Sequence, residues 1–200
     1  MLGYTLKFTL PNPTPRVSFL EFSPSGATLA VGSDSANTIH LHDRSSGFQP
    51  TLRITACAVP ACLAWKDHRS FVTALSDGSI VEHDLDLGSK TVINQTVHNL
   101  FKGSIPISAI VFNAGRDLLA IIVGPDVLGL KRDFITGADM QSISRELAKT
   151  RAGKFGAFVN LSNRTLFKRE PGVTVPPFPR SLCFSSGGVV VISYCRENIV

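Results

Sequence analysis

The sequence has few charged residues, few cysteines and no long apolar run. Charged residues make up 18% of the 200 residues and hydrophobic residues 44%, which excludes an intrinsically disordered chain. No segment approaches the roughly 18 consecutive apolar residues of a membrane-spanning helix. Residues 1–10 alternate apolar and polar side chains, unlike the apolar core of a signal peptide. We therefore expect an intracellular protein, cytoplasmic or nuclear, without a membrane span.

The four cysteines lack the spacing of a metal or redox motif. No two of them form a C-x-x-C pair, and each lies in an apolar or strand-like run. We expect four small, buried hydrophobic side chains in a reducing compartment. These residues are Cys57, Cys62, Cys183 and Cys195.

Motifs of catalytic sites are also absent. The chain has no Gly-x-Ser-x-Gly elbow, and Gly153-Lys154 lacks the upstream glycine of a phosphate-binding loop. His40 and His42 lie two residues apart on a predicted strand, and His83 occupies the position equivalent to His42 in the next repeat. These histidines could bind a metal or pack against neighbouring strands, and we favour packing. We predict no catalytic, cofactor-binding or metal-binding residues and no enzymatic activity.

A repeat of about forty residues organises the chain. Short runs of β-forming residues alternate with turns rich in Gly, Pro, Ser and Asp. Phe22, Trp65 and Phe112 end equivalent strands at intervals of 43 and 47 residues, and Asp43 lies 41 residues before Asp84. About four short strands in each period are typical of the blades of a β-propeller.

We therefore predict an all-β fold, a partial β-propeller of about three to four four-stranded antiparallel blades with one inserted short helix. Ala138–Thr150 is the expected helix, and Phe155–Phe158 and Thr165–Lys168 are candidate strands that complete the third blade. We predict that the whole chain forms one unit. It begins with a closing-type strand and its linker (1–16), followed by two blades (17–56 and 57–98). A third blade (105–170) contains a basic insertion (134–170), and an incomplete blade follows (178–200).

Three features of the repeat resemble the WD-repeat β-propeller family. The stretch Phe22-Ser23-Pro24-Ser25-Gly26 resembles the first turn of a WD repeat, and Ser76-Asp77-Gly78-Ser79-Ile80 resembles the second. Asp43 and Asp84 resemble the aspartates that close the third strand. The resemblance implies a non-catalytic scaffold, without a cofactor, that binds protein partners through its propeller loops.

The chain also departs from the family pattern. His42 and His83 stand where the family usually has tryptophan, and the Gly-His pair that begins a blade is absent. The hydrogen-bond tetrad of the family therefore cannot be complete, and these blades depend more on apolar stacking. Because a ring of this family usually has about seven blades, four copies imply a fragment of a larger propeller.

The positive charge is concentrated in one segment. Residues 131–169 contain nine basic and three acidic residues, whereas the whole chain has a formal charge of +5. This segment is either a solvated loop or a surface for nucleic acid, anionic lipid or an acidic protein. Nucleic-acid or anionic-surface binding is thus the alternative function. Its candidate residues are Arg145, Lys149, Arg151, Lys154, Lys168 and Arg169.

Overall fold

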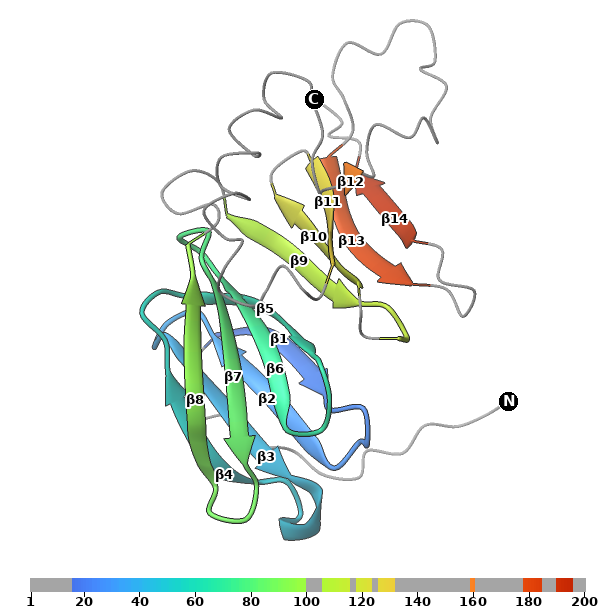
Figure 1. The fold of residues 1–200 in the computed structure, drawn as a ribbon. Helices are drawn as coiled ribbons and strands as arrows, with labels where there is room; N and C mark the ends of the chain where they lie inside the picture. Colours follow the sequence, from blue (N-terminus) through green and yellow to red (C-terminus); the bar gives the residue numbers. More distant parts are fainter. Residues whose placement is uncertain are drawn as a thin grey trace, which may run out of the picture.

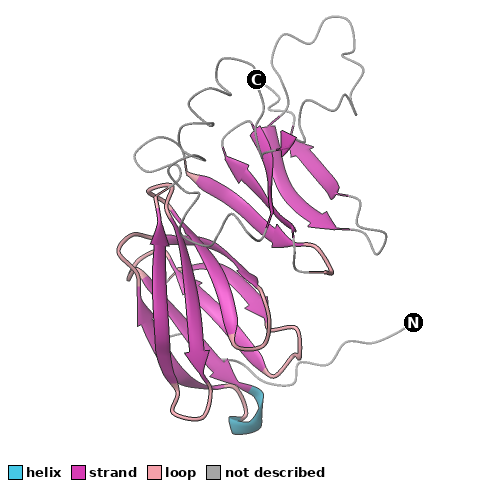
Figure 2. Cartoon of the chain, viewed as in Figure 1, coloured by secondary structure: helices cyan, strands magenta, loops and turns pink. Residues whose placement is uncertain are grey.

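A computed structural model describes residues 16–99, 106–115, 118–123, 126–131, 159–160, 178–184 and 190–195. Apart from one short 3-10 turn at Arg44–Ser46, every regular element among these residues is a β-strand (Figures 1 and 2). The strands form three four-stranded antiparallel sheets and one two-stranded sheet in this part of the chain. The predicted all-β fold class is therefore confirmed.

Each sheet is built from strands that follow one another in the sequence. The first contains β1 (Val17–Phe22), β2 (Thr28–Ser33), β3 (Thr38–Asp43) and β4 (Gln49–Thr55). The second contains β5 (Pro60–Trp65), β6 (Ser70–Leu75), β7 (Ile80–Asp86) and β8 (Thr91–His98). The third contains β9 (Ile107–Phe112), β10 (Leu118–Val123), β11 (Asp126–Lys131) and β12 (Val159–Asn160), and the last contains β13 (Phe178–Phe184) and β14 (Val190–Cys195).

The two turns singled out in the sequence connect neighbouring strands. In the first, the N–H of Gly26 donates to the carbonyl oxygen of Ser23 at 2.8 Å, and Gly26 has a φ of 67°. In the second, Gly78 has a φ of 82°, and the backbone N–H of Ser79 donates to Oδ1 of Asp77 at 3.0 Å. Glycine adopts a positive φ at little cost, so these residues fix where each strand reverses.

The first strands of the four sheets are neighbours in space. β1 contacts β5, β5 contacts β9, and β9 contacts β13 (Figure 1). Each of these strands forms one edge of its own sheet. The order of sheets in space therefore follows the order of repeats in the sequence, as in consecutive blades around an axis.

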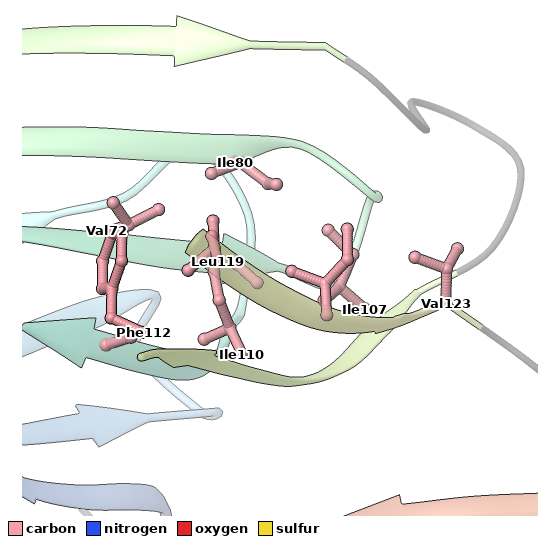
Figure 3. Packing of buried hydrophobic residues seen from close by; sticks show 10 residues of the cluster. Val72, Ile80, Ile107, Ile110, Phe112, Leu119 and Val123 are labelled. Atoms are coloured by element: carbon pink, nitrogen blue, oxygen red, sulfur yellow. The ribbon is translucent and has the colours of Figure 1, made fainter. Parts of the chain in front are cut away.

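Two apolar layers hold the first three sheets together. Between the first and second sheets, Ile39 and Leu41 pack with Leu63, Trp65 and Phe71. Between the second and third sheets lies another buried cluster, seen in Figure 3, whose labelled members are Val72, Ile80, Ile107, Ile110, Phe112, Leu119 and Val123. Alternate residues of β6 join different layers because successive side chains of a strand point to opposite faces. The inner strands of the second sheet are consequently buried on both faces, whereas its outer strand β8 is largely exposed.

Three expectations about the C-terminal half need comment. The predicted helix Ala138–Thr150 and the candidate strands Phe155–Phe158 and Thr165–Lys168 lie outside the described residues. Within the described part, the fourth strand of the third sheet is β12, in which Val159 pairs with Gly129 and Asn160 with Leu128. In the fourth repeat, predicted over residues 178–200, Phe178 at the start of β13 pairs with Cys195 on β14. Proline is tolerated in β13 because this strand lies at the edge of its sheet.

The prediction of four buried cysteines is partly wrong. Cys57 lies in the loop between β4 and β5 and is exposed, and Cys183 is exposed on β13, where burial alternates along the strand. Cys62 fits the expectation better, because it packs against the cluster between the second and third sheets. Burial raises the pKa of its thiol to about 12, so Cys62 is an unreactive thiol at neutral pH.

Candidate functional site

The ends of the first strands surround a hollow of about 210 Å³. It opens where each strand enters the turn to the next one, and strands β1, β5, β9 and β13 contribute to its wall. Most of the lining side chains are apolar, and Glu21 is the charged residue among them. The principal lining residues are Phe22, Pro24, Trp65, Ile110, Phe112 and Leu182.

The repeat itself places aromatic residues around this hollow. Phe22, Trp65 and Phe112 are the last residues of β1, β5 and β9, so one repeat position supplies all three rings. Nε1 of Trp65 donates a 3.3 Å hydrogen bond to the carbonyl oxygen of Glu21 in the preceding sheet. The polar atom of the indole is used in this bond. The surface that the hollow leaves open to a ligand is nevertheless more polar than apolar.

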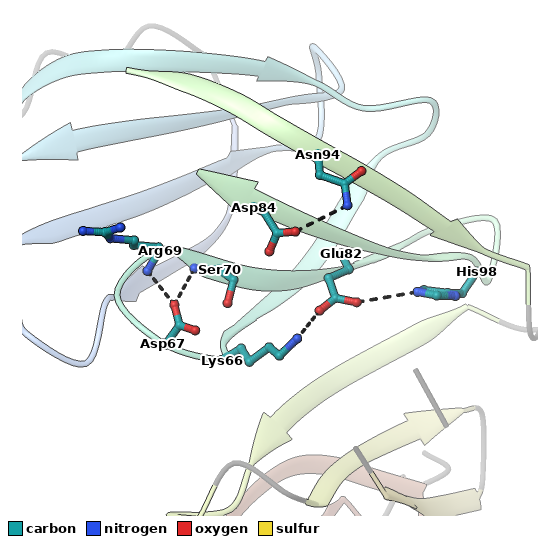
Figure 4. A network of polar contacts seen from close by, with 8 residues as sticks. All are labelled: Lys66, Asp67, Arg69, Ser70, Glu82, Asp84, Asn94 and His98. Carbon is teal, nitrogen blue, oxygen red and sulfur yellow. Dashed lines mark hydrogen bonds and ion pairs between the residues drawn. The ribbon is translucent and has the colours of Figure 1, made fainter. Parts of the chain in front are cut away.

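A polar network lies on the side of the second sheet that faces the third (Figure 4). Nζ of Lys66 contacts Oε1 of Glu82, and Nε2 of His98 lies 3.9 Å from Oε2 of the same carboxylate. The side chains of Lys66, Glu82 and His98 are all largely buried. His98 and then Lys66 hold the pKa of Glu82 at about 2, against burial, which alone would raise it.

The chemistry of this network is structural. A carboxylate with a pKa of about 2 stays ionised at neutral pH, so Glu82 cannot act as a general acid there and is a weak base. Nearby polar residues stabilise a turn of the same sheet. Oδ1 of Asp67 accepts hydrogen bonds from the backbone N–H groups of Arg69 and Ser70, at 2.7 and 2.8 Å. Lys66, Glu82 and His98 therefore connect the β5–β6 turn with β7 and β8 within the second sheet.

The histidines singled out in the sequence are buried between strands. His83 stacks on Phe71 with ring centroids 4.7 Å apart, and neither of its ring nitrogens has a hydrogen-bond partner among the described residues. Burial lowers its pKa to about 4, so its ring is neutral at pH 7. Nδ1 of His42 lies 2.9 Å from the carbonyl oxygen of Phe48. Packing, the interpretation favoured from the sequence, therefore describes both residues.

The described part of the chain holds no group of three or more His, Cys, Asp and Glu side chains suited to bind a metal. Among those same residues, no helix has the length and apolar composition needed to cross a bilayer. The candidate partner-binding residues Arg145, Lys149, Arg151, Lys154, Lys168 and Arg169 all lie outside the described residues. Their proposed role therefore stays a prediction.

Sequence reasoning missed both the hollow and the Lys66–Glu82–His98 network. The equivalence of Phe22, Trp65 and Phe112 was visible in the repeat, and it could have indicated an aromatic cluster at one end of the sheets. The network carried no comparable signal. Its residues come from a turn and two strands, and only the pairing of β7 with β8 brings Glu82 near His98.

Comparison with known proteins gives the fold a name. No family model and no curated protein matches the sequence. Among solved structures, the β-propeller domain of Cps50 (Swd1) from Myceliophteria thermophila has a TM-score of 0.58 at 12% identity, covering 89% of this chain and 50% of that one. The C-terminal WD40 domain of Sif2 has a TM-score of 0.56 at 15% identity, covering 92% and 44%. This chain has the fold of a partial β-propeller.

At such low sequence identity, a shared β-propeller fold does not indicate a shared function. Hydrazine synthase of Kuenenia stuttgartiensis is also similar, with a TM-score of 0.59 at 14% identity over 95% of this chain and 45% of that one. A synthase and WD40 domains therefore share this architecture, so the fold alone does not distinguish an enzyme from a binding domain. The chain spans half or less of the length of these three matched structures.

Proposed function

We propose that this partial WD40-type propeller is a non-catalytic scaffold that binds a protein partner at the hollow between its first strands. The observation that carries the proposal is the size and lining of that hollow. Pockets for drug-sized molecules occupy roughly 300–1,000 Å³, whereas this one measures about 210 Å³. It accommodates one or two side chains of a protein segment better than a whole small-molecule substrate.

The surroundings of the hollow support the same reading. Phe22 is half exposed beside it, and Pro24 is exposed in the turn that follows β1. Aromatic side chains at the rim of a hollow are typical anchors for a partner's side chains. The perturbed groups Glu82 and His83 belong to the packing between sheets, and neither lines the hollow. A protein interface is therefore the function that this geometry favours.

Photo-crosslinking in cells tests the proposal. A benzophenone amino acid at position 24 should attach to a partner protein, whereas the same amino acid at position 93 on β8 should not. Ile93 is a matched control because it is also an exposed apolar residue, on a strand that does not line the hollow. The additional substitution Val111→Glu places a charge in the wall and should abolish the product from position 24.

Two results would contradict the scaffold proposal. One is an identical set of products from positions 24 and 93, which would indicate non-specific capture. The other is that position 24 attaches only to a second copy of this chain, or to nothing. In either case a catalytic role would need fresh evidence from residues outside the described part.

A further inference from the structure

The outer strand of the second sheet, β8, has a neighbouring strand on one side only. It pairs with β7, and within the described residues no strand lies on its other side (Figure 1). Ile93 and Val97 on this strand are 69% and 46% exposed, and Ile93 is the most exposed large apolar side chain in the described part of the chain. An open edge of this kind can pair with a strand of another molecule.

The sequence of β8 lacks the residues that usually protect an edge. Proline and charged side chains on an edge strand discourage pairing between molecules. The outer strand of the first sheet, β4, contains both Pro50 and Arg53. β8 reads TVINQTVH, without proline, lysine, arginine or an acidic residue, and five of its eight residues are β-branched. Its ionisable residue, His98, is buried beside Glu82 of the same sheet.

The backbone groups of alternate residues in β8 point away from β7. On β7, the N–H of Leu85 donates to a carbonyl oxygen just before β6, so Leu85 bonds toward β6. Because this direction alternates along a strand, Asp84 bonds toward β8, and Asn94 opposite it bonds toward β7. By the same alternation, Gln95 and Val97 direct their N–H and C=O groups outward. These groups are available to a further strand.

The pattern of β8 fits antiparallel pairing with itself. In a pairing centred on Gln95, Ile93 lies opposite Val97 of the other copy, and Asn94 lies opposite Thr96. Apolar β-branched side chains therefore meet each other, polar side chains meet polar ones, and no like charges are opposed. The two Gln95 amides meet at the centre, and each has both donors and an acceptor. We propose that β8 pairs with β8 of a second copy of this chain, joining the two second sheets into one continuous sheet.

This pairing is symmetric and closed. Both copies use the same strand, related by a two-fold axis at the Gln95 pair, so the two open edges are satisfied at once and the contact does not propagate. The surface is separate from the hollow, because no residue of β8 is among those that line it. A photo-reactive amino acid at position 93 should therefore attach to a second copy of this chain, and not to the partner expected at position 24.

Disulfide crosslinking tests the register of the pairing. The two copies of residue 95 lie opposite each other, so Gln95→Cys should give a covalent dimer on mild oxidation. Ile93→Cys is the matched control, because its two copies would be displaced by about 14 Å along the strands, too far for a disulfide. The wild type, oxidised in the same way, shows any product of the native cysteines. Equal yields from the two variants, or no covalent dimer from Gln95→Cys, would overturn the proposal.

Sedimentation velocity over a concentration series measures the strength of the association in the full chain. The wild type should form a dimer, and Ile93→Lys should weaken it at least about 10-fold, because each dimer contains two contacts between Ile93 and Val97. Leu20→Lys is the control, since Leu20 is an exposed apolar residue on an edge strand of the first sheet. Circular dichroism should show native β-structure in both variants. A wild type that stays monomeric, or a dimer weakened by Leu20→Lys and not by Ile93→Lys, would contradict the proposed interface.

Amide hydrogen exchange of the wild type, resolved by NMR, needs no variant. The outward amides of Gln95 and Val97 should exchange quickly in dilute samples and slowly in concentrated ones. Those of Asn94 and Thr96 should be protected in both, because they bond to β7. Protection in residues 51–55 of β4 should not depend on concentration. Unchanged exchange of Gln95 and Val97 over the range in which the dimer forms would show that another surface is used.

Discussion

The indole of Trp65 joins two consecutive repeats through a single hydrogen bond to Glu21. Nε1 donates to the carbonyl oxygen of Glu21 at 3.3 Å, across 44 residues of sequence. The same indole packs edge-on against Phe71, with ring centroids 5.0 Å apart. Trp65 thus connects an edge strand of the first sheet with the interior of the second. Phenylalanine, which occupies the equivalent positions in β1 and β9, has no donor for such a bond.

Trp65→Phe should therefore destabilise the chain although it keeps an aromatic ring. We expect a loss of about 1–3 kcal/mol in the free energy of unfolding, from the hydrogen bond and the reduced packing volume. Urea unfolding followed by circular dichroism measures it. Trp65→Ala should cost more, about 3–5 kcal/mol, because the whole ring is removed. Equal stability of Trp65→Phe and the wild type would mean that the bond contributes nothing.

His83 should make stability depend on pH between about 6.5 and 4. Burial lowers the folded-state pKa of its ring to about 4, whereas the pKa of an exposed histidine is 6.5. In that interval the unfolded chain binds the proton more readily, so stability falls as the pH falls, by at most about 3 kcal/mol. His83→Phe should reduce this dependence, leaving the contribution of His40, whose pKa burial also lowers. It should also raise stability at pH 7 by about 1 kcal/mol, since two unsatisfied nitrogens disappear.

Urea unfolding at a series of pH values compares His83→Phe with a control. His68→Asn serves as the control because His68 is exposed in the turn between β5 and β6. The control should keep the full pH dependence of the wild type. If His83→Phe retains the same slope between pH 6.5 and 4, His83 is not the group responsible.

Glu82 should contribute at a lower pH. Its folded-state pKa of about 2 lies below the pKa of 4.5 of an exposed glutamate. Its contribution is therefore complete above about pH 4.5 and disappears as the pH falls toward 2. At pH 7, Glu82→Gln should cost roughly 1–3 kcal/mol, because Lys66 loses its counter-charge in a largely buried site.

The double variant Lys66→Met/Glu82→Met tests whether the attraction between the two charges exceeds the cost of burying them. Replacing both partners by apolar side chains removes the desolvation penalty along with the attraction, so it should cost less than Glu82→Gln alone. Thermal unfolding at pH 7 ranks the two proteins. A double variant that is the less stable one would show that the ion pair itself stabilises the contact between sheets.

Gly32 should not tolerate a side chain. A Cβ placed there would lie 2.2 Å from Cε1 of Phe19, far inside van der Waals contact. Gly32→Ala should displace the Phe19 ring and cost about 1–3 kcal/mol. In a Phe19→Leu background the same substitution should cost less, and a double-mutant cycle measured by urea unfolding gives the coupling. Strict additivity of the two effects would exclude the contact as the cause.

The scaffold proposal predicts no binding of a random-sequence DNA duplex at near-physiological salt. Fluorescence anisotropy over a salt series is the measurement. Binding that weakens steeply with salt would instead support the basic segment as a nucleic-acid surface. In that case, replacing the six basic residues by glutamine should remove it. Those residues are Arg145, Lys149, Arg151, Lys154, Lys168 and Arg169.

Much of the fold followed from local patterns. The strands Val17–Phe22 and Ile107–Phe112 have the bounds that their β-forming residues and flanking turns predict. Gly26 and Gly78 marked turns because glycine alone accepts a positive φ easily. The exposure of Cys57 could not be predicted, because its apolar neighbours suggest a buried strand although the residue lies in a loop.

The candidate site was less accessible to sequence reasoning. Phe22, Trp65 and Phe112 were recognised as equivalent positions, yet nothing local shows that strands from different repeats enclose a hollow together. Contacts between Lys66, Glu82 and His98 depend on strand pairing and on the approach of the third sheet. Such interactions join residues far apart in sequence, so a local sequence pattern does not predict them.

The sequence by itself determined the repeat, the turns and the alternation of buried residues, because these depend on backbone preferences and on neighbouring side chains. Only the tertiary structure decided the environment of each repeat position. Leu20 and Leu63 are the same residue at the same point of the repeat, yet one is 58% exposed and the other 5%. The reason is packing, since a preceding sheet covers β5, whereas Leu20 and Phe22 of β1 are left facing solvent.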